Sequence, residues 1–168
     1  MKAPDDAEFT EFAATTIRRL RRTAYLMCGD WHRAEDAAQD ALVKVYRRWH
    51  RIDRAQGLNG YAHQCLVTAV FDQARKPWRR ERLVDPDEQT GPLPDPVGTI
   101  DDRMLVVQAL GALPPSQRAC VVLRHYADLS LEQTADILGI GVGGVKSQTS
   151  RGLTRLRELL DQNERSAS

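Results

Sequence analysis

The sequence predicts an all-α protein built from two small helical domains that a flexible acidic linker joins. Apolar residues recur at intervals of three and four over residues 8–82 and again over residues 101–162, which is the spacing of an amphipathic helix. No segment alternates apolar and polar side chains as a half-buried strand does. Residues 83–100 hold four prolines, two glycines, four acidic residues and no basic residue, so we expect a linker without a core of its own.

Size and composition agree with this organisation. The 168 residues, of which 42% are hydrophobic, suffice for two modest cores. No run of about eighteen apolar residues predicts membrane insertion, and the acidic, polar N-terminus does not fit a secretory signal. Cys28, Cys65 and Cys120 lie far apart among apolar neighbours, so we expect buried free thiols in a reducing cytoplasm. Residues 163–168 resemble a frayed tail.

Charge is distributed unevenly along the chain. Residues 18–82 carry fifteen Lys and Arg residues against seven Asp and Glu residues, a net charge of +8. Residues 101–162 are balanced at seven against seven, yet residues 144–157 contain four basic residues and no acidic one. This pattern favours contact with nucleic acid by the first domain and by one helix of the second.

Residues 33–49 predict an amphipathic helix with two distinct faces. One face is a packing stripe of mostly small apolar residues, namely Ala34, Ala37, Ala38, Ala41, Leu42, Val45 and Trp49. The other carries Asp36, Gln39, Asp40, Val43 and Arg47 at the same spacing. An apolar valine among charged residues indicates a protein-binding face, but the pattern fits a merely solvated face equally well.

A second helix is expected near residues 58–82, with Leu66, Ala69, Val70 and Phe71 mostly buried. It ends in a basic cluster with an interleaved tryptophan, formed by Arg75, Lys76, Trp78, Arg79, Arg80 and Arg82. Phosphate contacts by the basic groups and stacking by Trp78 or Tyr61 would suit opened or single-stranded DNA. The alternative is a solvated helix end on which Trp78 covers the core.

No catalytic or metal-binding constellation is apparent. His63 and Cys65 lack the further ligands that zinc requires, so core packing is the better interpretation of both residues. Nothing resembles a phosphate-binding loop, a nucleophile elbow or a catalytic pair of carboxylates. The sequence therefore predicts no enzyme activity, no metal and no cofactor.

Residues 130–160 predict a helix-turn-helix. Ser130 is a natural N-cap of the first helix, and Gly139 supplies the left-handed residue that ends it. The small Ala135 lets the two helices approach each other. The second helix is expected from about Val142–Gly144 to Leu160. The apolar residues that we expect on the inner faces are Leu131, Leu138, Ile140, Val145, Leu153, Leu156 and Leu160.

The exposed face of this second helix is expected to carry Lys146, Ser147, Gln148, Arg151 and Arg155. Such side chains can reach base edges and phosphates in a major groove. The alternative is a helical hairpin with a solvated basic face. A basic stripe without acids on a neutral domain favours DNA binding.

Two segments together resemble a known family. AEDAAQDALVKVYRRW is similar to the polymerase-binding helix of sigma region 2. The segment from LGALPPSQRACVVLRHYADLS to GVKSQTSRGLTRLREL resembles sigma region 4, including its Leu-Pro-x-x-Gln-Arg start. The order and spacing of the two segments resemble those of extracytoplasmic-function, or group 4, sigma factors of the sigma-70 family. The segment VGGVKSQTSRGL is similar to the corresponding sequence of an actinobacterial subgroup. The resemblance covers about residues 8–160.

This resemblance implies the fold and function of a promoter-specificity subunit of bacterial RNA polymerase. Residues 8–82 would bind the clamp helices of the polymerase core through Asp36, Gln39, Asp40 and Val43. They would read the −10 element through Tyr61, Thr68, Asp72, Arg75, Lys76 and Arg79. Residues 101–162 would bind the −35 element and the polymerase flap. Promoter DNA and polymerase core are the implied partners, and the resemblance leaves an anti-sigma factor open as a further one.

The chain also departs from the family pattern. Thr68 stands where the family usually has Asn, and Gln64 and Val67 stand near positions that are usually basic. Gly141 and Gly144 replace the usual Ser and Thr at the start of the second helix. The rival interpretation is a free-standing helix-turn-helix regulator that binds operator DNA without polymerase. It would leave the face of Asp36–Val43 without a role.

Overall fold

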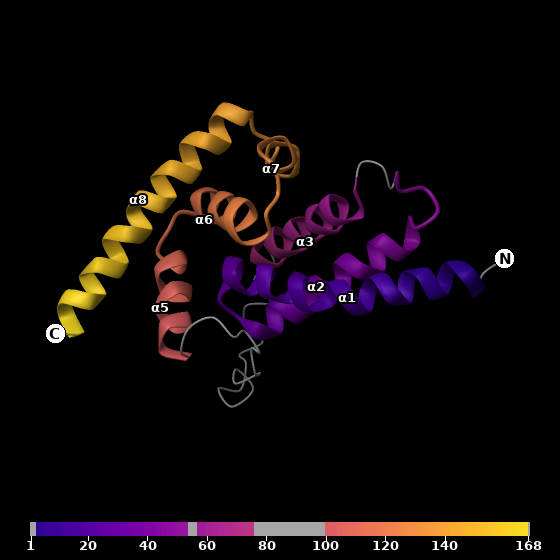
Figure 1. The fold of residues 1–168 in the computed structure, drawn as a ribbon, viewed down its shortest axis with the longest axis horizontal. Helices are drawn as coiled ribbons and strands as arrows, with labels where there is room; N and C mark the ends of the chain where they lie inside the picture. The colour runs from indigo at the N-terminus through magenta and orange to yellow at the C-terminus, as the bar shows by residue number, and fades with distance from the viewer. Residues whose placement is uncertain (1–2, 54–56, 76–99, 168) are drawn as a thin grey trace. The chain divides into compact units, whose positions relative to one another are not determined.

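A computed structural model describes residues 3–53, 57–75 and 100–167. These residues are almost entirely helical and contain no strand, so the all-α prediction is confirmed for them (Figure 1). They form two compact units, one on each side of residues 76–99. Residues 83–99 of the predicted linker, together with Lys76, Trp78 and Arg79, lie outside the described residues, whereas Ile100, which was predicted to end the linker, already belongs to a helix.

The first unit contains α1 (Ala3–Cys28), α2 (Trp31–Arg47) and α3 (Leu58–Arg75). Gly29, at a φ of 72°, follows α1 at a turn that favours glycine. The carboxylate of Asp30 then accepts hydrogen bonds from the backbone N–H groups of His32 and Arg33 at 2.9 and 3.1 Å. Asp30 therefore caps α2 and fixes where that helix begins.

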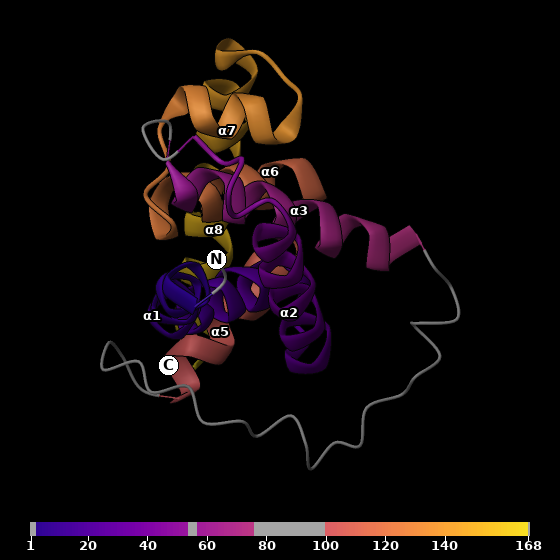
Figure 2. The same ribbon diagram turned by 90° about the vertical axis from the view of Figure 1, so that its right-hand side faces the viewer.

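Helix α2 packs against both α1 and α3 (Figure 2). The predicted alanine stripe is confirmed, because Ala34, Ala37, Ala38 and Ala41 are all fully buried, as is Val45. Leu42 is only half-buried. Trp49, just beyond α2, is buried against the rings of Phe9 and Phe12, with centroid distances of 5.4 and 5.6 Å.

Burial of the cysteines matches the prediction at two positions of three. Cys65 and Cys120 are buried and free. The expectation was wrong for Cys28, which is half-buried because it ends α1 beside the exposed turn at Gly29. Its thiol donates to the carbonyl oxygen of Asp30 at 3.3 Å.

His63 is a core residue, as expected. It is fully buried, and its Nδ1 lies 2.8 Å from the carbonyl oxygen of Asn59. Burial lowers the pKa of His63, and the nearby charge of Arg19 lowers it further against the opposing effect of that hydrogen bond. Within the described ranges, no group of three or more His, Cys, Asp or Glu residues could hold a metal ion.

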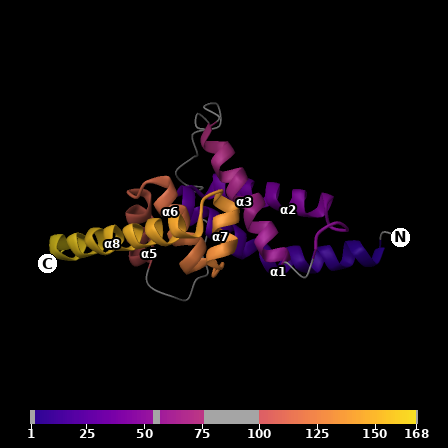
Figure 3. The ribbon, with the colours of Figure 1, turned by 90° about the horizontal axis from the view of Figure 1, so that it is seen from above.

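The second unit contains α5 (Ile100–Gly111), α6 (Pro115–Val121), a π-helical turn η2 (Val122–Tyr126), α7 (Leu131–Leu138) and α8 (Val142–Ala167). Helices α5, α6 and α7 all contact α8. The prediction of a frayed tail was wrong, since α8 continues to Ala167 as a straight helix (Figure 3). Residues 153–168 contain no proline or glycine, so no helix-breaking residue interrupts α8 before Ala167. None of the described helices is both long and apolar enough to cross a bilayer.

The helix-turn-helix prediction is confirmed in α7 and α8. Ser130 and Gln133 form a reciprocal capping box at the start of α7, with bonds of 3.0 and 2.9 Å. Gly139 takes the left-handed conformation, at φ 68° and ψ 32°, that ends this helix. Ala135, Val145 and Cys120 are buried together, and Leu131, Leu138, Ile140 and Val142 pack around them.

The inner face of α8 differs in detail from the prediction. Val145 is fully buried as expected, but Leu153, Leu156 and Leu160 are only half-buried. Instead, Thr149 and Gly152 continue the buried line from Val145. At Gly152 an added Cβ would lie 2.7 Å from Cγ2 of Val121, so α6 and α8 approach too closely there for any side chain.

Candidate functional site

The outer face of α2 presents the four residues that the sequence predicted for partner binding. Asp36, Gln39, Asp40 and Val43 are all exposed and lie opposite the alanine stripe. Val43 is 48% exposed, which is unusual for an apolar side chain on a helix so well packed on its other face. Among the residues that the structure describes, no cation pairs with Asp36 or Asp40. The face therefore combines unpaired negative charge with one exposed apolar side chain.

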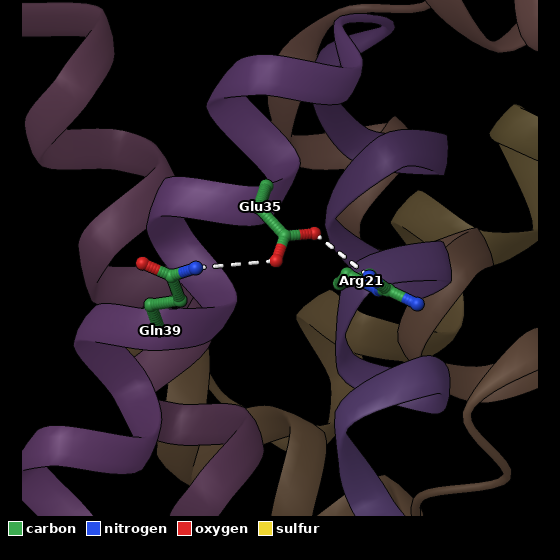
Figure 4. A network of polar contacts seen from close by, with 3 residues as sticks. All are labelled: Arg21, Glu35 and Gln39. Atoms are coloured by element: carbon green, nitrogen blue, oxygen red, sulfur yellow. Dashed lines mark hydrogen bonds and ion pairs between the residues drawn. The ribbon is translucent and has the colours of Figure 1, made fainter. Parts of the chain in front are cut away.

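A polar network flanks this face. The side-chain amide of Gln39 donates through Nε2 to Oε1 of Glu35 at 3.2 Å, and Nη1 of Arg21 lies 3.0 Å from Oε2 of the same carboxylate (Figure 4). Arg21 belongs to α1, whereas Glu35 and Gln39 belong to α2. The sequence pattern did not point to Arg21 or Glu35 as site residues. The sequence does show that Glu35 lies four residues before Gln39, a spacing at which two side chains of a helix meet. Which residue of α1 contacts Glu35, however, depends on how the two helices pack.

The predicted −10 residues that the structure describes form a stripe along α3. Tyr61, Thr68, Asp72 and Arg75 are separated by seven, four and three residues, which keeps them within roughly 60° of one another around the helix. Thr68 and Arg75 are exposed, and Tyr61 and Asp72 are half-buried. Partial burial raises the pKa of Tyr61, and a side-chain hydrogen bond with Cys65 raises it further. The hydroxyl group of Tyr61 therefore stays protonated at neutral pH. Lys76 and Arg79 lie outside the described residues.

The predicted −35 residues lie on α8 but not on one narrow face. Ser147 and Arg151 are exposed near the middle of the outer surface, opposite Val145 and Gly152. Lys146 lies at one edge, whereas Gln148 and Arg155 lie at the other. At 3.6 residues per turn, Lys146 and Arg151 point about 140° apart. The basic surface of α8 is therefore broad, and Arg151 is its centre.

Arg155 has a partner within its own helix. Its Nη1 lies 3.2 Å from Oε2 of Glu158, and both side chains are about half-exposed. By contrast, within the described part of the chain neither Lys146 nor Arg151 forms an ion pair. Among the predicted −35 residues, Lys146 and Arg151 are thus the cations that are available to an anionic ligand.

Comparison with known proteins connects these surfaces to a family. The family model for sigma-70 region 2 matches residues 7–80, and the model for sigma-70 region 4 matches residues 103–156. This chain belongs to the sigma-70 family. It resembles sigma factors of the extracytoplasmic-function type over nearly its whole length, as the following relatives show.

The relatives of this sigma factor include actinobacterial proteins. It is 36% identical over 156 residues to the RNA polymerase sigma-E factor of Streptomyces coelicolor, covering 91% of this chain and 86% of that protein. It is 30% identical to the ECF RNA polymerase sigma factor SigM of Mycobacterium tuberculosis, covering 94% and 80%. A solved structure of the sigma factor RpoE from Bartonella quintana, in complex with the anti-sigma factor NepR, matches with a TM-score of 0.77 and 26% identity, covering 92% of this chain and 97% of that one.

The two family matches place each surface of the sigma factor in a region. The α2 face and the α3 stripe fall in the region 2 match, and the helix-turn-helix falls in the region 4 match. Arg118, part of the Leu-Pro-x-x-Gln-Arg sequence, has a structural role. Its guanidinium donates to the carbonyl oxygens of Leu110, Gly111 and Leu113 at 2.8, 3.1 and 3.0 Å. Arg118 therefore supplies hydrogen-bond donors to carbonyl groups at the end of α5, which have no partner within the helix.

Proposed function

We propose that this sigma factor binds RNA polymerase core through the outer face of α2 and recognises promoter DNA through α3 and α8. In this proposal residues 8–82 bind the clamp helices and the −10 element, residues 83–100 link the domains, and residues 101–162 bind the −35 element and the flap. The observation that carries it is the unpaired acidic face of Asp36 and Asp40 within a region 2 match, followed by a basic helix-turn-helix within a region 4 match.

The α2 face suits contact with a protein partner. Two exposed carboxylates precede the 48% exposed Val43 along the helix, so a basic partner surface with an apolar contact beside it would complement the face. The alanine stripe anchors the opposite side of the helix, so the face is held rigidly. A free operator-binding regulator, the rival interpretation, would give this surface nothing to bind.

DNA recognition is divided between the two units. On α8, Arg151 and Lys146 would contact the −35 element, with Ser147 and Gln148 as neutral hydrogen-bonding groups and Arg155 at one edge. On α3, the stripe of Tyr61, Thr68, Asp72 and Arg75 would face the −10 element, and Lys76 and Arg79 would extend it. The neutral phenol of Tyr61 could then stack on a base or donate a hydrogen bond.

Further parts of the proposal follow from the family. The chain would act by binding and not by catalysis, and it would work in the cytoplasm, where polymerase is found. The solved complex of RpoE with the anti-sigma factor NepR supports an anti-sigma factor as a further partner of this chain.

Reversing the charge of the α2 face tests the proposal. Asp36→Arg combined with Asp40→Arg should abolish binding to polymerase core while helicity, followed by circular dichroism, is unchanged. The matched control is Asp161→Arg with Glu164→Arg, an equal change of charge at two exposed residues of α8 beyond the region 4 match. The control should bind core like the parent protein. Core binding at parental affinity by the Asp36 and Asp40 variant would refute the assigned surface.

A further inference from the structure

The orientation of one side-chain amide decides what the α2 face offers a partner. Gln39 can present either an acceptor, Oε1, or a donor, its NH2 group. The carboxylate of Glu35 has no hydrogen to donate, so its 3.2 Å contact with Gln39 requires the NH2 group. Oε1 of Gln39 consequently points away from Glu35, as Figure 4 shows.

Glu35 is itself held by the neighbouring helix. Its second carboxylate oxygen lies 3.0 Å from Nη1 of Arg21, and the two side chains are 38% and 37% exposed. An ion pair this exposed contributes little to stability. It does direct the Glu35 carboxylate along α2 toward Gln39, because one oxygen lies against Arg21 and the other accepts from the amide.

We propose that Arg21 and Glu35 are positioning residues that hold Gln39 as a hydrogen-bond acceptor, so that the first part of the α2 face, from Asp36 to Asp40, presents acceptors alone. Since Oε1 of Gln39 points away from Glu35, the free polar groups of this part of the face are that oxygen and the carboxylates of Asp36 and Asp40. Such a face selects a partner surface of arginine and lysine side chains, which only donate. The inference rests on the proposed function, in which this face binds polymerase core.

Exchanging the charges of the pair isolates the orientation of Gln39. In the double variant Arg21→Glu with Glu35→Lys, the ion pair between α1 and α2 and the net charge are both kept. The ammonium group at position 35 has only donors, so Gln39 turns Oε1 toward it and presents NH2 outward. The partner then meets a donor where the parent protein offers an acceptor.

The readouts are affinity for polymerase core and the unfolding midpoint of the first unit. We expect the exchange to weaken core binding about tenfold or more, the scale of one hydrogen bond to a charged group, with no loss of thermal stability. In a Gln39→Ala background the same exchange should change affinity little, because there is no amide to turn. That comparison also removes any effect of moving the two charges.

A rescue completes the test. Adding Gln39→Glu to the exchanged pair gives position 39 a carboxylate, which can accept from the lysine with one oxygen and face the partner with the other. Core affinity should return toward the parental value. An exchange that leaves affinity unchanged, or weakens it equally with and without Gln39, overturns the positioning role. If instead the Asp36 and Asp40 reversal fails to weaken binding, the surface itself is wrong, so the two failures are distinguishable.

Discussion

Two glycines of α8 provide a matched pair whose replacement by alanine should have opposite effects on stability. Both lie within α8, Gly144 in its first turn and Gly152 in its interior, and in a helix interior glycine is less favourable than alanine by about 1 kcal/mol. At Gly144 an added Cβ would meet Cδ1 of Ile140 at 3.6 Å, which is an ordinary contact. At Gly152 it would meet Cγ2 of Val121 at 2.7 Å and the carbonyl oxygen of Gln117 at 3.3 Å.

The magnitudes follow from these distances. Gly144→Ala should stabilise the second unit by about 0.5–1 kcal/mol, which raises the unfolding midpoint by roughly 2–8 °C in a domain of this size. Gly152→Ala gains the same helix preference but forces α6 and α8 apart, and overpacking costs about 1–3 kcal/mol. Its midpoint should therefore fall below that of the parent protein.

Thermal unfolding followed by far-ultraviolet circular dichroism measures both changes. None of the three tryptophans lies in residues 100–167, and Trp31 and Trp49 lie in the first unit, so tryptophan fluorescence does not follow α5 to α8 and serves as an internal control. Its midpoint should not move in either variant. Midpoints that shift in the same direction for Gly144→Ala and Gly152→Ala would refute the close approach of α6 and α8 at Gly152.

Three further predictions concern acid stability, capping and DNA binding. Since burial lowers the pKa of His63 below its ordinary value of 6.5, the unfolded chain binds more protons, and stability of the first unit should fall as pH drops below about 6.5 toward the folded pKa. His63→Gln should flatten that decline in tryptophan-monitored unfolding between pH 7.5 and pH 5.5; an unchanged slope would contradict it. Ser130→Ala removes the cap of α7 and should cost about 1 kcal/mol of stability in urea unfolding followed by circular dichroism, and a cost near zero would mean that the capping box is not formed in solution. Arg151→Ala should weaken binding of the holoenzyme to a cognate promoter by about 1–3 kcal/mol, and Arg155→Ala by less because Glu158 already engages Arg155; the reverse order would move the DNA-contacting centre along α8.

The features predicted correctly from sequence are those that local chemistry decides. The capping residue Ser130 and the left-handed Gly139 specify the boundaries of α7 with no help from distant residues. The two faces of α2 follow from a period of 3.6 residues, which is why both the buried alanines and the exposed Val43 were predicted. The family resemblance added the assignment of function, which periodicity alone left open.

Features that depend on packing between helices were not predictable in the same way. The contact of Arg21 with Glu35 joins two helices across fourteen positions in sequence, and several arginines of α1 were equal candidates. The burial of Gly152 depends on how closely α6 crosses α8. The broad spread of Lys146 and Arg155 on α8, by contrast, follows from helical geometry and was available from the sequence.

The alanines of α2 have a consequence for conformational entropy. Burying a long side chain costs rotamer freedom, whereas burying alanine costs none, because its side chain has no rotamers to lose. Ala34, Ala37, Ala38 and Ala41 are fully buried, so α2 docks on its neighbours through this stripe without freezing any side-chain torsion there. The position of the outer face is thus set by the distance between the backbone of α2 and those of its neighbours. A partner that binds this face does not have to order the helix that carries it.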